Sequence, residues 1–293
     1  MDVFRTPDER FDGLPGFDFE PNYAEVDGLR LHYLDEGQGD PVICFHGEPT
    51  WSYLYRKMIG PLVDAGSRVV VPDYPGFGRS DKPTDRDWYS YDRHVGYVTR
   101  LLARLDIENA TVVVQDWGGP IGLRWAVENA DQVARLVILN TGLFTARAEP
   151  SKAFLAWRDF AERNPDLPIG FVIQGATKTE VPQEIVDAYE APWPTPESKA
   201  GTAAFPLLVP LTPDDPGAAE MGQVAEVLSN WDKPVLVCFS DSDPIFTPKT
   251  GQRLVDFIPG AQDLRVIEGG AHFLQEDRGE QIAAEIVSFL RGG

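Results

Sequence analysis

Hydrophobic and polar positions alternate in two distinct ways along the chain. Residues 23–35 alternate around Asp27-Gly28, a turn signal typical of a hairpin, and this predicts two antiparallel strands near the start. Short β-branched runs then alternate with segments whose apolar positions recur at helical spacing. The strand-like runs are Pro41–Phe45, Arg68–Pro72, Thr111–Gln115, Arg135–Asn140, Pro234–Ser240 and Leu264–Glu268, and the helical segments include Asp92–Leu105, Ile121–Asn129 and Glu280–Leu290. This alternation predicts an α/β fold, with a mostly parallel sheet and helices on both faces.

One interval interrupts this alternation. Residues 142–230 contain no clear β-run, whereas Phe154, Trp157 and Phe160 share one helical face. We interpret this interval as a mostly helical insertion, a cap. At that place in the chain it is expected to lie over the carboxyl ends of the strands, where open α/β sheets bind ligands. The expected core domain consists of the remaining residues, 1–141 and 231–293.

Composition and charge narrow the function classes. With 293 residues the chain is long enough for a large α/β domain with an insertion. Its 26 basic and 46 acidic side chains give a net charge of −20, which repels phosphate backbones and anionic lipids and argues against a nucleic-acid or membrane partner. The first residues lack the apolar segment of a signal peptide, and no stretch approaches the roughly 20 apolar residues of a membrane span. We expect a cytoplasmic monomer.

The two cysteines fall within apolar runs. Cys44 and Cys238 occupy predicted buried strands, where cysteine behaves as a small hydrophobic residue. We therefore expect neither a disulfide nor a metal site.

The most informative motif is residues 112–122, Val-Val-Val-Gln-Asp-Trp-Gly-Gly-Pro-Ile-Gly. A β-branched run, a glycine turn and an amphipathic segment predict a strand, a tight turn and a helix, with Asp116 at the apex. In esterases this geometry presents a serine over the sheet edge. An aspartate there is already ionised at neutral pH and can attack saturated carbon. The alternative is a helix N-cap, because an aspartate at that position accepts N–H groups of the following helix.

A histidine and two carboxylates follow later predicted strands. His272 lies in a glycine-containing loop after the last strand-like run, at the sheet edge that also carries Asp116. Asp241 and Asp243 follow the run 234–240, and either can hold the imidazole in its useful tautomer. We favour Asp243 and regard Asp241 as a solvated loop residue. The chain order nucleophile, acid, histidine is that of the α/β-hydrolase architecture.

Backbone donors for a developing oxyanion are expected at two places. One is the N–H of Trp117, directly after the candidate nucleophile, and the other is the N–H of Glu48 in the loop after the run 41–45. The Glu48 carboxylate has two open interpretations, positioning of a water molecule or a capping or surface role. His46 is expected to pack under the loop, and nothing assigns a role to the histidines at positions 32 and 94.

Tryptophans suggest how a leaving anion is held. Trp117 adjoins the candidate nucleophile, and its indole N–H is a donor without an acceptor of its own, which suits a departing halide. A second donor is expected from the cap, where Trp157, Trp193 and Trp231 are the candidates. Trp157 belongs to the apolar face of a predicted helix and is the preferred choice.

These features together resemble the haloalkane dehalogenases of the α/β-hydrolase superfamily. The resemblance extends over nearly the whole chain, and the segments that carry it are His46-Gly-Glu-Pro-Thr-Trp-Ser-Tyr-Leu-Tyr-Arg, Asp73-Tyr-Pro-Gly-Phe-Gly-Arg-Ser-Asp-Lys-Pro, Val114-Gln-Asp-Trp-Gly-Gly, Phe154-Leu-Ala-Trp, Phe205-Pro and Ala271-His-Phe-Leu-Gln-Glu. A sister branch has asparagine where Glu48 stands and places its acid after the strand that ends here at Asn140, which is not a carboxylate. The chain is therefore more similar to the branch with two halide-binding tryptophans.

The resemblance implies a role for each candidate residue. Asp116 corresponds to the nucleophile, His272 to the base and Asp243 to the triad acid, while Trp117 and Trp157 correspond to the halide donors. An aspartyl alkyl ester forms as halide leaves, and water then cleaves it to a primary alcohol, halide and a proton, without a cofactor. The backbone N–H groups of Glu48 and Trp117 form the oxyanion hole. The apolar residues expected to line the substrate cavity are Phe154, Phe205, Pro206, Val209 and Ile245.

Three other functions were compared with this one. Epoxide hydrolases also use an elbow aspartate but need cap tyrosines, and Tyr189 is the only tyrosine in 142–230. Fluoroacetate dehalogenases are expected to carry arginines just after the nucleophile, whereas the sequence here is Trp-Gly-Gly-Pro. A catalytically silent ligand-binding protein of the same fold is the third alternative, and a complete triad argues against it.

Overall fold

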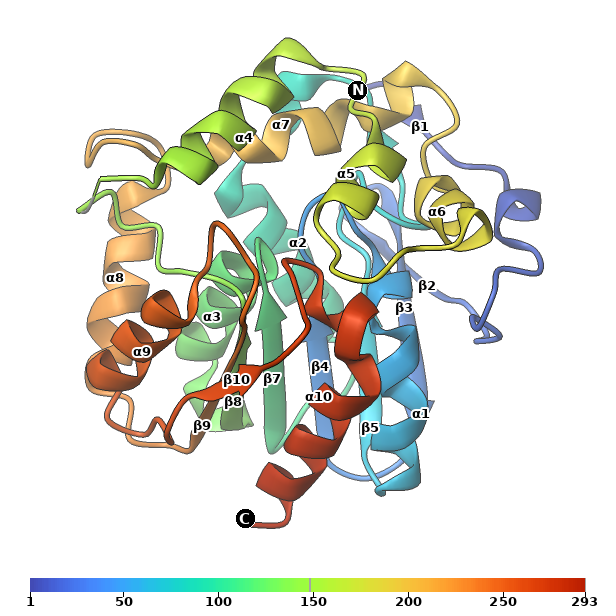
Figure 1. The fold of residues 1–293 in the computed structure, drawn as a ribbon. Coiled ribbons are helices and arrows are strands. Elements are labelled where there is room, and N and C mark those ends of the chain that lie inside the picture. Colours follow the sequence, from blue (N-terminus) through green and yellow to red (C-terminus); the bar gives the residue numbers. More distant parts are fainter. Residues whose placement is uncertain (148, 293) are drawn as a thin grey trace.

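The predicted hairpin and strand runs form one sheet in the computed structural model, which describes residues 1–147 and 149–292. Across this eight-stranded sheet the order is β10 (Arg265–Ile267), β9 (Val235–Ser240), β8 (Val133–Leu139), β7 (Ala110–Gln115), β4 (Pro41–Phe45), β5 (Arg68–Pro72), β3 (Leu29–Gly37) and β2 (Asn22–Val26). The β2–β3 and β3–β5 pairs are antiparallel and the other neighbours are parallel (Figure 1). The expected α/β class with a mostly parallel sheet is confirmed.

The central strands are buried on both faces, which explains their composition. Every residue of β4, β7 and β9 is buried, so these strands are continuous apolar runs rather than alternating ones. The cysteines Cys44 and Cys238 lie in β4 and β9 as buried thiols. A small antiparallel pair, β1 (Val3–Phe4) with β6 (Lys82–Pro83), was not expected from the sequence, because two residues per strand leave no periodicity to detect.

Helices cover both faces of the sheet (Figure 1). On one face α1 (Arg56–Asp64) packs against α10 (Leu274–Leu290). On the other face α2 (Tyr91–Leu102) and α8 (Ala218–Leu228) both pack against α3 (Gly118–Glu128), while α9 (Pro248–Phe257) packs against β9. Ser90 begins α2 as its N-cap, because its side chain accepts a hydrogen bond from the N–H of Arg93 at 3.3 Å.

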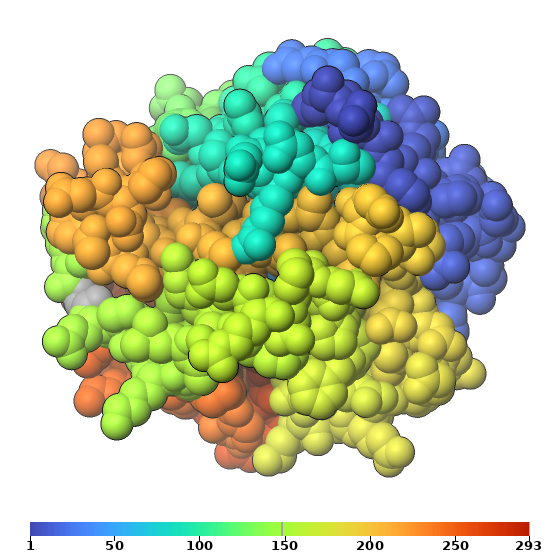
Figure 2. All heavy atoms as spheres, turned by 90° about the horizontal axis from the view of Figure 1, so that it is seen from above, coloured from blue at the N-terminus to red at the C-terminus, as the bar shows by residue number. Residues whose placement is uncertain are grey.

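The cap consists of α4 (Lys152–Arg163), α5 (Ile169–Gly175), α6 (Gln183–Glu190) and α7 (Ala200–Leu208). These helices lie above the strands in Figure 1, and their yellow-green to orange atoms cover much of the face seen in Figure 2. The expected interval 142–230 also includes α8, but Met221, Val224 and Leu228 of that helix are buried and α8 packs against α3 in the core layer. α8 therefore lies with the helices that cover the sheet, whereas α4–α7 lie above the strands (Figure 1).

The described helices do not have the features of a membrane-spanning segment. Within residues 1–147 and 149–292, none combines the length and apolar character that a bilayer crossing requires.

Candidate active site

Asp116 lies at a sharp turn between β7 and α3. Its φ angle is +49°, a left-handed conformation that costs energy for a residue with a side chain and persists only where the surroundings hold it. The N–H of Asp116 donates to Asn140 O at 3.0 Å, and Thr141 Oγ1 donates to Asp116 O at 2.7 Å. A Cβ on Gly47 would overlap the Asp116 side chain, and one on Gly118 would overlap the backbone of β4. The glycines therefore allow the strand-turn-helix to form against the neighbouring loop.

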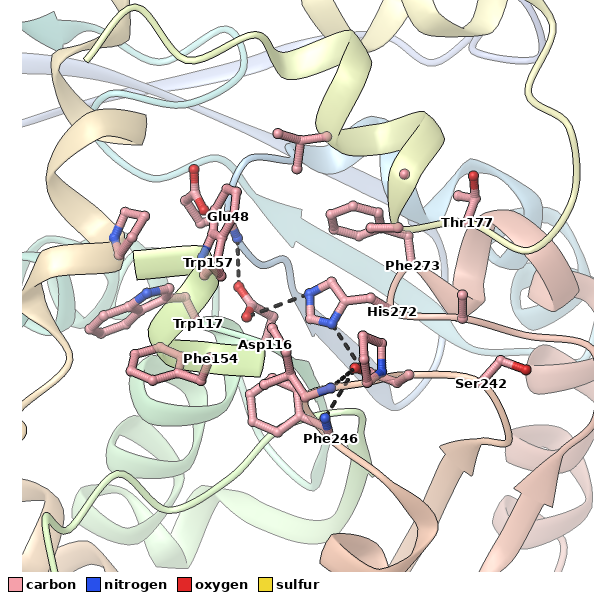
Figure 3. Close-up of a pocket in the computed structure, with 18 of the residues that line it drawn as sticks. Glu48, Asp116, Trp117, Phe154, Trp157, Thr177, Ser242, Phe246, His272 and Phe273 are labelled. Atoms are coloured by element: carbon pink, nitrogen blue, oxygen red, sulfur yellow. Dashed lines mark hydrogen bonds and ion pairs between the residues drawn. The ribbon is translucent and has the colours of Figure 1, made fainter. Parts of the chain in front are cut away.

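His272 lies between two carboxylates. Its Nδ1 is 2.9 Å from Asp243 Oδ2, and its Nε2 is 3.6 Å from Asp116 Oδ2 (Figure 3). Asp243 is buried and fixed by the N–H groups of Ile245 and Phe246, which donate to its Oδ1 at 2.7 and 3.0 Å. Asp241 is exposed and bonds the N–H of Gly269 instead. The structure therefore brings Asp243, and not Asp241, to the imidazole.

The charges of Asp116, Asp243 and His272 shift one another's pKa values. Burial lowers the pKa of His272, but the adjacent Asp243 carboxylate outweighs it and holds that pKa above its ordinary value. Burial raises the pKa of Asp116, and the opposing effects of His272 and of the N–H groups of Glu48 and Trp117 offset only part of the rise. With Asp116 ionised and His272 neutral, this set contains a nucleophile and a base side by side.

Backbone N–H groups lie against the Asp116 carboxylate. The N–H of Glu48 donates to Asp116 Oδ1 at 2.8 Å, and the N–H of Trp117 also acts to lower the pKa of this carboxylate. Both expected oxyanion donors thus point at the same carboxyl group. The second oxygen, Oδ2, faces His272.

The Glu48 side chain is buried beside the same carboxylate and lines the cavity. Burial and the negative charge of Asp116 raise the pKa of Glu48 well above its ordinary value, so the neutral acid is favoured. Its Oε1 has no hydrogen-bond partner within the described part of the chain. A surface role is thereby ruled out for this side chain, and its Oε1 is a buried polar atom without a partner among the described residues.

A cavity of about 330 Å³ lies next to Asp116 and His272, which both line it. Among the residues that line it are Trp117 and Trp157, and Figure 3 shows both on the side of Asp116 opposite His272. The other candidates lie elsewhere. Trp193 is buried and donates its indole N–H to Gly76 O at 3.0 Å, and Trp231 is buried outside the cavity, between α8 and β9.

Four of the five apolar residues expected at the cavity line it. They are Phe154, Pro206, Val209 and Ile245. The prediction for Phe205 was wrong, because this residue does not line the cavity. It is fully buried and packs edge-on against Trp117, with 5.0 Å between the ring centroids. Adjacent residues of a helix point in different directions, so Pro206 of α7 faces the cavity while Phe205 supports the tryptophan from behind.

The other histidines are buried away from the cavity. His46 stacks on Tyr74 with ring centroids 4.1 Å apart, under the loop that carries Glu48. His32 bonds Asp73 at 2.7 Å, and His94 bonds two backbone carbonyls. Burial lowers the pKa of His46 and of His94 to about 4, so both favour the neutral form. Within residues 1–147 and 149–292 no cluster of His, Cys, Asp and Glu has the arrangement of a metal site.

Comparisons with known proteins agree with this geometry. A family model described as alpha/beta hydrolase fold matches residues 40–190. A haloalkane dehalogenase of Psychrobacter cryohalolentis is 48% identical over 99% of this chain and 98% of its own, and one of Mycobacterium marinum is 46% identical over 99% and 100%. The chain belongs to the haloalkane dehalogenase family. The structure of the tetrameric haloalkane dehalogenase of Paraglaciecola agarilytica superposes with a TM-score of 0.93, at 34% identity and 97% coverage of both chains.

Membership of the haloalkane dehalogenase family confirms the resemblance drawn from the motifs, but several polar residues around the site were missed. Asn140 Nδ2 donates to Ala271 O at 2.9 Å and to Ser240 Oγ at 2.8 Å, and Gln115 Nε2 donates to His272 O at 3.2 Å. They hold the backbone of the histidine loop from the core. Each follows or ends a buried strand at the carboxyl edge, and a polar residue in that position was the signal available in the sequence.

Proposed function

We propose that this enzyme hydrolyses the carbon–halogen bond of halogenated alkanes through an ester on Asp116. The observation that carries the proposal is an elbow aspartate with one oxygen bonded to the N–H of Glu48 and the other beside His272, at the end of an apolar cavity with two tryptophans. An ionised carboxylate needs no base to attack carbon, whereas a serine does. The arrangement suits displacement at saturated carbon better than acyl transfer.

In the first step Asp116 Oδ2 attacks the carbon that bears the halogen. The new carbon–oxygen bond forms as the carbon–halogen bond breaks, and the halide leaves with the bonding electron pair. The indole N–H groups of Trp117 and Trp157 hydrogen-bond the halide as its charge develops, which is worth most in a cavity with few polar groups. No cofactor takes part.

In the second step water attacks the carboxyl carbon of the ester. His272 Nε2 accepts the proton of this water, and the Asp243 carboxylate stabilises the imidazolium through Nδ1. The former Oδ1 carries the negative charge of the tetrahedral intermediate and is held by the N–H groups of Glu48 and Trp117. Collapse breaks the bond between the carboxyl carbon and Oδ2, and the leaving oxygen takes the proton of the added hydroxyl, so a primary alcohol is released and the Asp116 carboxylate is restored. The proton on His272 passes to solvent.

The neutral side chain of Glu48 positions the attacking water in this proposal. It lines the cavity next to Asp116, so a water molecule beside the Asp116 carboxyl group can hydrogen-bond the Glu48 carboxyl group.

Epoxide hydrolysis is less well supported. That reaction needs a tyrosine O–H in the cavity to protonate the epoxide oxygen, but the Tyr189 hydroxyl donates to Glu276 at 2.7 Å and the residue does not line the cavity. The test is a panel of short bromo- and chloroalkanes and the matching epoxides, assayed for halide and for diol. We expect halide release without diol, and its loss in Asp116→Ala with circular dichroism unchanged. Diol formation, or a fully active Asp116→Ala variant, would contradict the proposal.

A monomer remains our proposal for the state in solution. The Paraglaciecola agarilytica relative is described as tetrameric, whereas the net charge of −20 makes copies of this chain repel each other. Light scattering coupled to size exclusion is expected to give a mass near 32.5 kDa at moderate ionic strength. A mass of twice or four times that value would contradict it.

A further inference from the structure

A single buried carboxylate joins the cap to the loop that carries His272. Asp277, in the first turn of α10, accepts the N–H of Thr179 at 2.8 Å and the hydroxyl of Thr179 at 2.6 Å, both through Oδ1. It also accepts the N–H of Lys178 at 2.9 Å through Oδ2. The same Oδ2 accepts the N–H of Ala271, also at 2.9 Å. Cap and catalytic loop thus share one acceptor atom.

A second bond reinforces this link. The N–H of Phe273 donates to the carbonyl of Ala176 at 3.1 Å, so His272 is flanked on both sides by backbone groups that are fixed relative to cap residues 176–179. These cap residues matter for substrate because Ala176, Thr177 and Lys178 line the cavity, and Figure 3 shows Thr177 at its edge beyond Phe273.

The carbonyl groups of Ala271 and His272, by contrast, accept hydrogen bonds from core residues. Ala271 O accepts from Asn140 and Ser240, and His272 O accepts from Asn140 and Gln115. The core therefore fixes the loop from below, and the Asp277 carboxylate fixes it from the side of the cap.

We infer that Asp277 is a positioning residue for ester hydrolysis, and that it sets the place of His272 according to the conformation of cap residues 176–179. The inference rests on the proposed function, because only the second step uses His272 as a base. Alkylation uses Asp116 and the tryptophans, which Asp277 does not contact. Loss of the carboxylate thus slows hydrolysis of the ester more than its formation.

The experiment measures the two steps separately in Asp277→Asn. An amide keeps the size of the side chain but replaces one acceptor oxygen with a donor group, so it cannot accept from both Ala271 and Thr179 as the carboxylate does. Rapid-quench mass spectrometry of the peptide that contains Asp116 gives the rate constants of alkylation and hydrolysis. We expect the hydrolysis constant to fall roughly ten- to hundredfold, the cost typical of a misplaced catalytic group, while alkylation changes by less than about threefold.

A matched control is present in the cap. Asp215 accepts the N–H groups of Leu211 and Thr212 and the hydroxyl of Thr212, the same set of donors that Asp277 receives from Lys178 and Thr179. It has no bond to the histidine loop. Asp215→Asn is expected to keep the ratio of the two rate constants of the parent enzyme.

A milder pair of variants covers the case in which Asp277→Asn does not fold. Thr179→Val removes only the hydroxyl bond to Asp277, and Thr212→Val is its control at Asp215. Thr179→Val is expected to slow hydrolysis about threefold, with hydrogen exchange accelerated together at the amides of 178, 179 and 271. That exchange result does not depend on the chemistry of the enzyme.

The outcomes separate the inference from the function on which it rests. His272→Phe must accumulate alkylated Asp116, and failure to do so would contradict the proposed function. If His272→Phe accumulates the ester but Asp277→Asn and Thr179→Val slow both steps equally, or no more than their controls, the positioning role is overturned.

Discussion

The two oxygens of Asp116 are inequivalent with respect to His272. Oδ2 lies 3.6 Å from His272 Nε2, whereas Oδ1 is bonded to the N–H of Glu48 at 2.8 Å. In the proposed mechanism, Oδ2 is therefore the oxygen that attacks carbon and later leaves with the alkyl group, and His272 is placed to accept the proton of the water that attacks the carboxyl carbon.

This relationship predicts where labelled oxygen goes. In a single turnover in water enriched in oxygen-18, with enzyme in excess, the alcohol is expected to contain ordinary oxygen from Asp116, and the label is expected on the Asp116 carboxylate. Mass spectrometry of the alcohol and of the peptide that contains residue 116 checks this. Label in the alcohol would mean that water attacks the alkyl carbon directly.

The Asp243 carboxylate predicts the pH dependence. Hydrolysis needs a neutral imidazole, so the rate falls with decreasing pH through the raised pKa of His272, above its ordinary 6.5. In Asp243→Asn the main cause of the rise is removed and burial remains, while the smaller contribution of the Asp116 charge is absent once Asp116 is esterified, so the acidic limb of kcat moves to lower pH. The maximal rate falls roughly 10²- to 10⁴-fold because the imidazolium loses its partner.

Asp241→Asn is the matched control for this variant. Its carboxylate is exposed and bonds Gly269 rather than His272. In Asp241→Asn, the acidic limb of the kcat–pH profile and the maximal rate are expected to stay as in the parent enzyme. An acidic limb that does not move in Asp243→Asn would argue against the triad assignment.

Trp157 is expected to be the second halide donor. Trp157→Phe removes one hydrogen bond to an anion, worth about 1.5–3 kcal/mol, which corresponds to roughly a ten- to hundredfold weaker affinity for chloride or bromide. Titration of tryptophan fluorescence measures it. Trp193→Phe and Trp231→Phe are expected to bind halide as the parent does, because these rings lie outside the cavity. The reverse pattern would show that another tryptophan is the donor.

The raised pKa of Glu48 predicts that replacing this residue with glutamine stabilises the folded protein at neutral pH. Its pKa is raised in the folded state, so its contribution is fully present below its ordinary value of 4.5 and is lost as the pH rises through the folded pKa. Glu48→Gln cannot ionise. It is expected to be more stable than the parent to urea at neutral and alkaline pH, with the difference vanishing below pH 4.5, while ester hydrolysis slows. Equal stability at all pH values would contradict a raised pKa.

A buried ion pair beneath the cap predicts the opposite dependence. Arg56 donates to both oxygens of Glu276 at 2.6 and 2.8 Å, and Tyr189 of the cap donates to the same carboxylate. Burial alone would raise the pKa of Glu276, but the Arg56 guanidinium holds it at about 2, so its stabilising contribution is present above 4.5 and is lost as the pH falls through about 2. Glu276→Gln leaves Arg56 buried without its charge partner, a cost of about 3–5 kcal/mol in urea unfolding at neutral pH.

An exposed ion pair provides the comparison. Arg124 and Glu128 lie four residues apart on α3, and Glu128 is 48% exposed. Glu128→Gln is expected to change the free energy of unfolding by less than about 1 kcal/mol. If Glu276→Gln behaves in the same way, the buried pair does not stabilise the fold.

Local patterns were sufficient to predict the sheet and the residues that the structure brings together around His272. The runs 41–45 and 68–72 coincide with β4 and β5, because residues buried on both faces of a parallel sheet leave a continuous apolar signal. The order of strand, turn and helix around Asp116 likewise lies within a dozen residues. Asp243 was preferred to Asp241, and it is the one that bonds His272.

Contacts between distant parts of the chain were not predictable in this way. Arg56 and Glu276 are 220 positions apart, and Lys178 is 99 positions from Asp277, so no periodicity relates the partners. Phe205 was misplaced because two adjacent apolar residues of a short helix give no indication of which one faces the cavity.

The cap is one continuous segment of the chain, and this has a consequence for the exchange of caps between related enzymes. β8 and β9 are hydrogen-bonded neighbours, and the whole cap is one excursion between them. Its residues form much of the cavity wall, whereas Asp116, Asp243 and His272 all come from outside it. A chimaera can therefore receive a foreign cap through two junctions and retain its reacting groups. The graft must still supply a hydroxyl for Glu276, a turn whose amides reach Asp277 and an indole N–H for Gly76 O, so contacts of this kind limit which caps are interchangeable.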